Sequence, residues 1–176
     1  LDNTNILGAV EGKSILVTGA AGSIGSEIAR QLSYYNVDKL ILIDHAESPL
    51  YDIEQELIEK YKSRKTVKPI CEVANVKDRY RMNVLFDTYK PQLVFHAAAY
   101  KHVPIIEKAP YEGIFVNVFG TRIVADLSME YGVEKFVMVS TDKAVNPTNV
   151  MGATKRVAEL YTQSLNEFGK TKFIAT

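Results

Sequence analysis

Short apolar segments alternate with amphipathic segments along almost the whole chain. Five apolar segments have the length of strands and are nearly continuous, at residues 14–18, 40–44, 67–73, 93–98 and 136–140. Strands covered by helices on both faces have this composition. Helical periodicity fills the intervals, at residues 23–35, 49–61, 78–89, 111–131 and 150–168. The alternation predicts an α/β fold: a doubly wound parallel sheet of the Rossmann type, with helices on both faces.

Two helix boundaries carry clear local signals. Ser48 and Pro49 have the composition of an N-cap and a first helical position. Lys90 and Pro91 are expected to end the third helix before the fourth strand. Residues 172–176 begin a sixth strand. We expect one domain over residues 1–176, with residues 1–11 as a lead-in, in a fragment of a longer protein that lacks the C-terminal substrate lobe.

Composition excludes several classes of function. Lys and Arg together number 21, as do Asp and Glu, which argues against nucleic acid as the main partner. Cys71 is the only cysteine, so no intrachain disulfide is possible and a cysteine metal cluster is not expected. No segment approaches the ~20 apolar residues of a membrane span. We expect a soluble, cytoplasmic domain without a metal.

A glycine-rich turn joins the first strand to the first helix, from Gly19 through Gly22 to Gly25. In dinucleotide-binding turns the first glycine permits the tight turn, the second lets the backbone approach a pyrophosphate, and the third packs the helix closely on the strand. The amides that open the helix, at Ser23, Ile24 and Gly25, are then available to phosphate. A plain turn is the structural alternative.

Asp44 ends the second strand, where a carboxylate can accept both hydroxyls of an adenosine ribose. The same charge repels a 2′-phosphate, and no Arg follows it in residues 45–48, so the sequence favours NAD over NADP. Glu72 and Val73, at the end of the third strand, are candidates for the adenine edge; a solvated carboxylate is the alternative. The small residues Ala97, Ala98 and Ala99 suit close approach of the cofactor, or alternatively helix packing.

A second group of polar residues follows the fifth strand, at Ser140, Thr141, Asp142 and Lys143. Met151 and Lys155 come next, four residues apart, and positions i and i+4 share one helix face. Met151 and Lys155 are therefore expected to face the same site as Ser140.

On these residues the chain resembles an extended short-chain dehydrogenase/reductase, in which a Ser or Thr, a Tyr and a Lys surround the nicotinamide. Met151 stands where the Tyr is expected. More narrowly, residues 96–104 (HAAAYKHVP) and 140–155 (STDKAVNPTNVMGATK) resemble the CapD-like polysaccharide-biosynthesis enzymes. These are UDP-N-acetylglucosamine 4,6-dehydratases, and their membrane-anchored branch also carries Met for Tyr. The similarity extends from Gly12 onward.

The resemblance implies oxidation at C4 of the sugar by NAD, loss of water across C5–C6, and return of the hydride to C6. Lys155 would bind the nicotinamide ribose, and Ser140 would hydrogen-bond the C4 oxygen. Lys143 is the candidate base at C5, which requires partial desolvation. Asp142 is the candidate acid for the C6 hydroxyl, which requires a raised pKa, and Thr141 would assist this proton transfer.

A thioether has no titratable group, so Met151 cannot take the C4 proton, and either Asp142 or a water molecule does so instead. Without the resemblance, a solvated Asp142–Lys143 ion pair and a core Met151 are the ordinary interpretations. Lys101 is expected to reach a substrate or cofactor phosphate, and Asn149 belongs to a turn that shapes the sugar pocket.

Three further polar residues carry weaker expectations. Asn117, inside the predicted fourth helix, corresponds to the structural Asn that holds a bend and a water; an exposed helix Asn is the alternative. His96 and His102 are expected to be packed or hydrogen-bonded rather than catalytic.

The leading interpretation is the NAD-binding portion of a UDP-sugar 4,6-dehydratase for surface polysaccharide or glycoconjugate synthesis. The alternatives are a nucleotide-sugar 4-epimerase, against which Asp142 and Lys143 argue, and a non-catalytic NAD-sensing module. The resemblance implies that the full-length protein is anchored in the bacterial inner membrane by segments absent from this chain. The long fourth and fifth helices allow a homo-oligomer.

Overall fold

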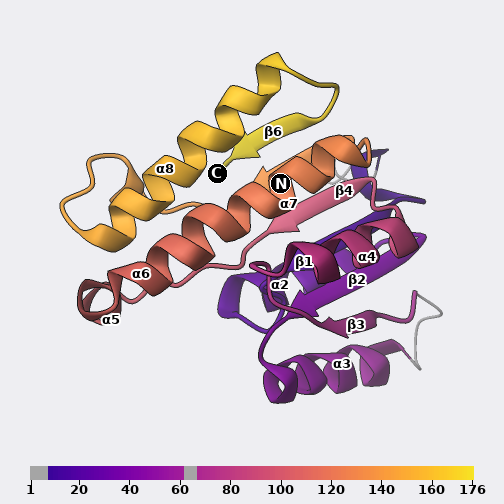
Figure 1. Ribbon diagram of the computed structural model, residues 1–176. Coiled ribbons are helices and arrows are strands. Elements are labelled where there is room, and N and C mark those ends of the chain that lie inside the picture. Colours follow the sequence, from indigo (N-terminus) through magenta and orange to yellow (C-terminus); the bar gives the residue numbers. More distant parts are fainter. Residues whose placement is uncertain (1–7, 62–66) are drawn as a thin grey trace.

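The computed structural model describes residues 8–61 and 67–176, so residues 1–7 of the expected lead-in lie outside it. Its centre is a six-stranded parallel sheet in the order β3-β2-β1-β4-β5-β6 (Figure 1). The strands are β1 Ser14–Thr18, β2 Lys39–Asp44, β3 Ile70–Val73, β4 Leu93–His96, β5 Lys135–Met138 and β6 Lys172–Ala175. The predicted doubly wound fold is confirmed, including the sixth strand.

Helices cover the sheet in two groups, each with its own hydrophobic core. On one face, α2 (Ser23–Leu32) and α3 (Glu47–Tyr61) pack against the side of the sheet that carries Ile15 and Val17. On the other face, α4 (Arg79–Tyr89), α7 (Thr121–Glu130) and α8 (Val150–Ser164) cover the side that carries Leu16. Successive side chains of β1 point to opposite faces of the sheet and so enter the two cores in turn, which explains why all five residues of β1 are buried.

Three short helical segments complete the second face: α5 (Val103–Lys108), α6 (Pro110–Gly113) and the 3-10 turn η2 (Asp142–Ala144). A further 3-10 turn, η3 (Leu165–Glu167), follows α8. The sequence analysis missed α5. It has only six residues, too few for helical periodicity to show.

The predicted helix at residues 111–131 is divided in the structure. It consists of α6, a π-helical segment η1 (Ile114–Gly120) and α7. In Figure 1 these pieces run on as one long, continuous rod beside α8. The predicted range was therefore nearly right, and the π-helical segment lies where a bend was expected, at Asn117.

The predicted start of α3 was wrong. The helix begins at Glu47, and its first backbone bond joins the Leu50 amide to the Ala46 carbonyl. The Asp44 carboxylate accepts the Ala46 amide at 3.0 Å, just before the helix, and the Ser48 hydroxyl donates to Glu47 rather than acting as the expected N-cap. Pro49 still falls in the first turn, where a missing N–H removes no helix bond.

The other predicted boundary was right. Helix α4 ends at Tyr89, and Lys90 adopts a left-handed conformation with φ 45° before Pro91. At the opposite end of α4, Asp78 caps the Arg81 amide at 2.9 Å. Strands β4 and β5 end two residues earlier than predicted, because the residues after them turn into the loops that line the site; β3 ends at Val73 as predicted but begins three residues later.

Candidate active site

At two of its glycines, the turn after β1 leaves no room for a side chain. Gly19 has φ +68°, and a Cβ there would lie 2.6 Å from the Ala98 amide nitrogen. A Cβ at Gly25 would lie 2.0 Å from the Gly19 carbonyl oxygen. Gly22 is less restricted, since its Cβ would lie 3.2 Å from the same oxygen. The backbone of this turn is thus packed directly against the loop after β4.

The start of α2 exposes a set of backbone donors. Gly22 occupies the N-cap position and makes no side-chain cap. Within residues 8–61 and 67–176, the amides of Ser23, Ile24 and Gly25 donate to no protein acceptor, as expected for the first turn of a helix. No acidic residue lies in that turn. Donors and the positive end of the helix dipole together favour an anion here.

Asp44 lies at the carboxyl end of β2 and is 7 % exposed. Its Oδ2 accepts the Ala21 amide and its Oδ1 the Ala46 amide, both at 3.0 Å. Each carboxylate oxygen has a second lone pair, so Asp44 can still accept two hydroxyls. The position expected from the sequence is therefore realised beside the glycine turn.

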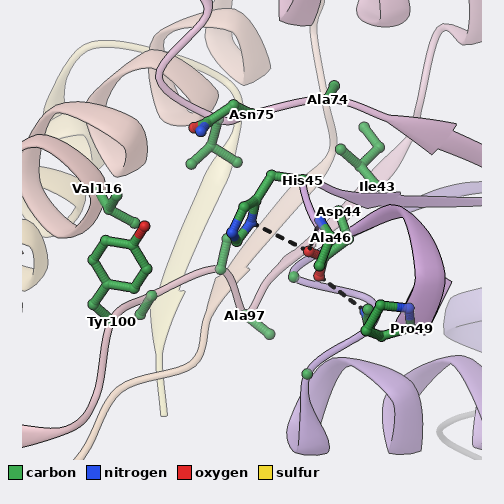
Figure 2. Close-up of a pocket in the computed structure, with 16 residues that line it drawn as sticks. Ile43, Asp44, His45, Ala46, Pro49, Ala74, Asn75, Ala97, Tyr100 and Val116 are labelled. Atoms are coloured by element: carbon green, nitrogen blue, oxygen red, sulfur yellow. Dashed lines mark hydrogen bonds and ion pairs between the residues drawn. The ribbon is translucent and has the colours of Figure 1, made fainter.

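A cavity of about 250 Å³ opens beside Asp44. Figure 2 shows His45 and Asn75 extending into it from the ends of β2 and β3, with Tyr100 on the opposite side. Ala97, Ala98 and Ala99 also line it, as the sequence analysis expected. His45 Nδ1 lies 3.3 Å from Asp44 Oδ1.

Two residues predicted for the adenine edge do not reach this cavity. The Glu72 carboxylate binds Arg81 at 2.6 Å and accepts the Tyr89 hydroxyl, and the exposed Val73 does not line the cavity either. The lining comes instead from Ala74, Asn75 and Val76, just beyond the end of β3. The strand proved to end before its lining residues, so the prediction was misplaced by two or three positions.

A second cavity, of about 340 Å³, continues the first, and both are lined by Gly22, Ala97, Ala99 and Tyr100. Its remaining lining joins the start of α2 and the loop after β4 to most of the predicted catalytic residues, which come from the segment after β5, from η2 and from α8: Ser23, Ile24, Gly25, Lys101, Val139, Ser140, Thr141, Lys143, Met151 and Lys155. Asp142 is absent from this set. The two cavities form one groove along the carboxyl edge of the sheet, where open α/β sheets bind ligands.

Lys155 is 5 % exposed, and its ammonium donates to the Val139 carbonyl at 2.7 Å. Burial lowers the pKa of Lys155 to about 8, against the opposing effect of the Glu159 charge. Met151, one turn earlier, is 2 % exposed and lines the same cavity. The predicted shared face of α8 is confirmed.

Ser140 is oriented differently from the prediction. It lies two residues beyond the end of β5, and its hydroxyl donates to the carboxylate of Glu159. In this arrangement the Ser140 proton is committed to Glu159, whereas its oxygen can still accept a hydrogen bond. Thr141 lines the same cavity, and its hydroxyl donates to Asp142 at 2.9 Å.

Asp142 and Lys143 form an exposed ion pair, with Nζ 3.4 Å from Oδ1. The hydrogen bond from Thr141 and the charge of Lys143 hold the pKa of Asp142 below its ordinary value. The raised pKa expected for an acid is therefore not found, because the carboxylate faces solvent. The Lys143 side chain is 51 % exposed, so the expected desolvation is not found either.

The two predicted substrate residues occupy different positions. Lys101 lines the second cavity and crosses the groove, with Nζ donating to the Ser23 hydroxyl at 2.8 Å. Asn149 is not part of the lining: it is the N-cap of α8, and its Oδ1 accepts the Gly152 amide at 2.8 Å. Its function in the structure is to start the helix that carries Lys155.

Asn117 connects three parts of the site. From the π-helical segment, its side chain binds both the amide and the carbonyl of Tyr100, at 2.8 and 3.0 Å. Its Nδ2 also donates to the Thr154 hydroxyl on α8 at 2.9 Å. The predicted structural role is confirmed, and it serves to fix the loop after β4 relative to α8.

Several site residues were missed by sequence reasoning. Asn75 and His45 line the first cavity, Glu159 binds Ser140, and Glu107 on α5 accepts the Val150 amide at 2.7 Å. Only the i+4 spacing of Glu159 from Lys155 could have signalled one of them. His96, expected to be packed, is fully buried between two hydroxyls.

Residues 8–61 and 67–176 contain no cluster of three or more His, Cys, Asp or Glu side chains that could hold a metal ion. No helix among them is long and apolar enough to cross a membrane.

The fold and the groove define a class: Rossmann-type proteins of the short-chain dehydrogenase/reductase kind. The chain belongs to the polysaccharide biosynthesis protein family, whose profile it matches over residues 15–176. The expected family is thereby confirmed.

Two named relatives are similar to this chain over nearly its whole length. The chain is 51 % identical to the capsular polysaccharide biosynthesis protein CapD of Staphylococcus aureus, over 99 % of this chain and 29 % of that protein. It is 36 % identical to an inverting UDP-N-acetylglucosamine 4,6-dehydratase of Campylobacter jejuni, over 94 % of this chain and 48 % of that protein. The chain thus spans between about a third and a half of these relatives.

Solved structures agree with the fold. Pen from Bacillus thuringiensis superimposes with a TM-score of 0.82 at 26 % identity, covering 94 % of this chain and 50 % of that one. The UDP-glucose 4-epimerase of Thermotoga maritima gives 0.77 at 25 %, covering 92 % and 53 %.

Proposed function

We propose that this chain is the NAD-binding portion of a nucleotide-sugar 4,6-dehydratase of the UDP-N-acetylglucosamine type, serving surface polysaccharide or glycoconjugate synthesis. One observation carries the proposal. Thr141, Lys143, Met151 and Lys155 line a single cavity that continues directly from the groove beside Asp44. The Campylobacter jejuni relative, which is named as such a dehydratase, supports the reaction type.

Three independent features of the groove fit NAD. The glycine turn leaves no room for a Cβ at Gly19 or Gly25, the amides that open α2 are free for a diphosphate, and Asp44 retains lone pairs for a ribose diol. We assign the diphosphate to the amides of residues 23–25, and the nicotinamide ribose to Lys155. NAD held there would supply the hydride acceptor and donor.

The protein side chains would handle the protons. Lys143 would take the C5 proton as a free amine, and Asp142 would protonate the departing C6 hydroxyl, so that one water is lost. Both residues are exposed in this chain, so their desolvation has to come from the bound sugar and the rest of the protein. Because Ser140 donates its hydroxyl to Glu159, Thr141, which lines the same cavity, would contact the C4 oxygen.

Met151 leaves the C4 proton without a phenol to accept it. Asp142 carries its negative charge at neutral pH and lies within hydrogen-bonding distance of Thr141. We therefore propose that Thr141 passes the C4 proton to Asp142, which then returns it to the C6 oxygen. The two steps balance, because the proton that leaves C4–OH ends on the leaving water.

Two alternatives have specific support. Similarity to a UDP-glucose 4-epimerase favours epimerisation, and Met151 favours an NAD-sensing module. Neither needs the Asp142–Lys143 pair at the cavity mouth. Anchoring in the bacterial inner membrane, the cytoplasmic location and a homo-oligomer stay predictions.

The test uses the full-length protein with UDP-N-acetylglucosamine in heavy water. We expect a product that has lost one water and gained deuterium at C5, detected by mass spectrometry and NMR. Lys143→Ala should stop deuterium incorporation, whereas Lys68→Ala, at an exposed position, should not. A product of unchanged mass would establish an epimerase, and an unaltered substrate with NAD bound would establish a sensor.

A further inference from the structure

Glu159 is a buried acid behind the proposed active site. Its side chain is 12 % exposed, and it lies on α8, one turn beyond Lys155 and two turns beyond Met151. It does not line either cavity of the groove. A carboxylate in such a place needs partners that offset its lost hydration.

The partners of Glu159 come from both sides of the site. Oε1 accepts the hydroxyl of Ser140, from the segment that follows β5. Oε2 accepts Arg156 Nη1 at 3.1 Å, on the same helix. The Ser140 contact spans 19 residues of sequence and joins the two elements that carry Thr141 and Lys155.

Glu159 is also the buried negative charge nearest to Lys155 along α8. The ammonium of Lys155 contacts a neutral carbonyl, that of Val139, and Met151 contributes no charge. The electrostatic influence of Glu159 on Lys155 favours the protonated amine and opposes the effect of burial. The other titratable groups near Lys155 are His96 on β4, whose pKa the charge of Lys155 affects, and Lys101 and Lys143, which line the same cavity.

We propose that Glu159 is a positioning residue of this site: it anchors the Ser140–Thr141 segment to α8 and keeps Lys155 in its charged form. The proposal rests on the proposed function. It also explains why the Ser140 hydroxyl donates to a protein carboxylate rather than to the sugar. Thr141, which lines the same cavity, is then left to contact the sugar.

The two roles of Glu159 can be separated by substitution in the full-length protein. Glu159→Gln removes the charge but keeps an oxygen that can accept the Ser140 hydroxyl. Ser140→Ala removes the anchor but keeps the charge. Glu167→Gln, an exposed acid in η3, is the matched control for loss of a negative charge.

The measured quantities are the pH dependence of kcat/KM and of NADH affinity. For Glu159→Gln we expect the alkaline limb of both profiles to move down by roughly half to one pH unit, because Lys155 loses its charge earlier. For Ser140→Ala we expect an unmoved limb and a several-fold lower kcat. Glu167→Gln should match the wild type in both.

The proposal is overturned if the pH profiles of Glu159→Gln superimpose on those of the wild type, whether or not the variant has a lower melting temperature. If Glu159→Gln does not fold, as judged by circular dichroism, Glu159→Asp takes its place. Glu159→Asp keeps the negative charge but has a shorter side chain that should not reach Ser140. It should therefore reproduce the Ser140→Ala result. A wild-type kcat for Glu159→Asp would overturn the anchoring role. A wild-type protein that binds NADH but makes no product contradicts the proposed function alone.

Discussion

At the scale of residues, the hydrogen bonds around His96 determine which atom of this network carries each proton. The Thr121 hydroxyl donates to the Asn117 carbonyl at 2.7 Å, so its oxygen can only accept from His96 Nε2. Nδ1 is then the unprotonated nitrogen, and it accepts the Thr18 hydroxyl at 2.7 Å. Both ring nitrogens are used by the neutral imidazole, so a second proton on Nδ1 would have to displace the Thr18 hydrogen bond.

This network predicts a loss of stability in acid. Burial, and to a smaller extent the charge of Lys155, lower the pKa of His96 to about 3. Between an unfolded pKa near 6.5 and that value, only the unfolded state binds the proton. The free energy of unfolding should therefore fall by up to about 1.4 kcal/mol per pH unit as the pH decreases below 6.5.

Urea unfolding at pH 7 and pH 5 measures this slope. A His96→Asn variant should be less stable at pH 7 but should lose less on acidification than the wild type. His102→Asn, at an exposed histidine, is the control and should keep the full slope. Equal slopes in the wild type and His96→Asn would contradict the assignment.

At the scale of elements, the junction of β1 and α2 depends on the absence of side chains. Gly25 packs against the Gly19 carbonyl, and Gly19 packs against the backbone after β4. These contacts place the start of α2 at the edge of the groove. The strand, turn and helix therefore act as one unit.

We expect Gly25→Ala to weaken NADH binding at least tenfold and to destabilise the fold by roughly 1–3 kcal/mol, because its Cβ would overlap backbone that has no room to move. Gly8→Ala adds the same methyl group in open space and is the control. Fluorescence titration with NADH and thermal unfolding provide the two measurements. A Gly25→Ala protein with wild-type affinity would show that the turn does not hold the cofactor.

Element boundaries could be predicted from the sequence where one residue decides them, as Asp78 and Pro91 do for α4. They could not be predicted where a distant group decides. The bonds from Asn117 to Tyr100, 17 residues away in the chain, accompany the wider turn in η1. The end of β3 at Val73 was predicted correctly, but Ala74, Asn75 and Val76 beyond it line the cavity in place of Glu72, which only the packed structure shows.

At the scale of the whole molecule, the strand order places β1 and β4 in the middle of the sheet and β3 and β6 at its edges. All residues of β1 are buried, whereas those of β3 are partly buried or exposed. The groove runs along the carboxyl ends of the central strands. The most firmly held backbone therefore supports the proposed cofactor site.

This arrangement predicts a gradient of hydrogen exchange. Hydrogen-bonded amides of β1 should exchange at least roughly tenfold more slowly than those of β3 and β6, because local opening of an edge strand breaks bonds on one side only. NMR or mass spectrometry of the exchanging protein gives the rates. Equal protection across the six strands would mean that the sheet opens only as a whole.

The strand–helix alternation, the glycine turn, Asp44 and the shared face of Met151 and Lys155 could be predicted from the sequence, because each follows from local periodicity or backbone geometry. Two contacts could be seen only in the folded molecule: the Ser140 hydroxyl donates to Glu159, and the Lys155 ammonium donates to the Val139 carbonyl. Those outcomes depend on contacts between β5, η2 and α8 that are distant in the chain. Hydrogen bonds and burial are properties of the packed molecule, and no local pattern encodes them.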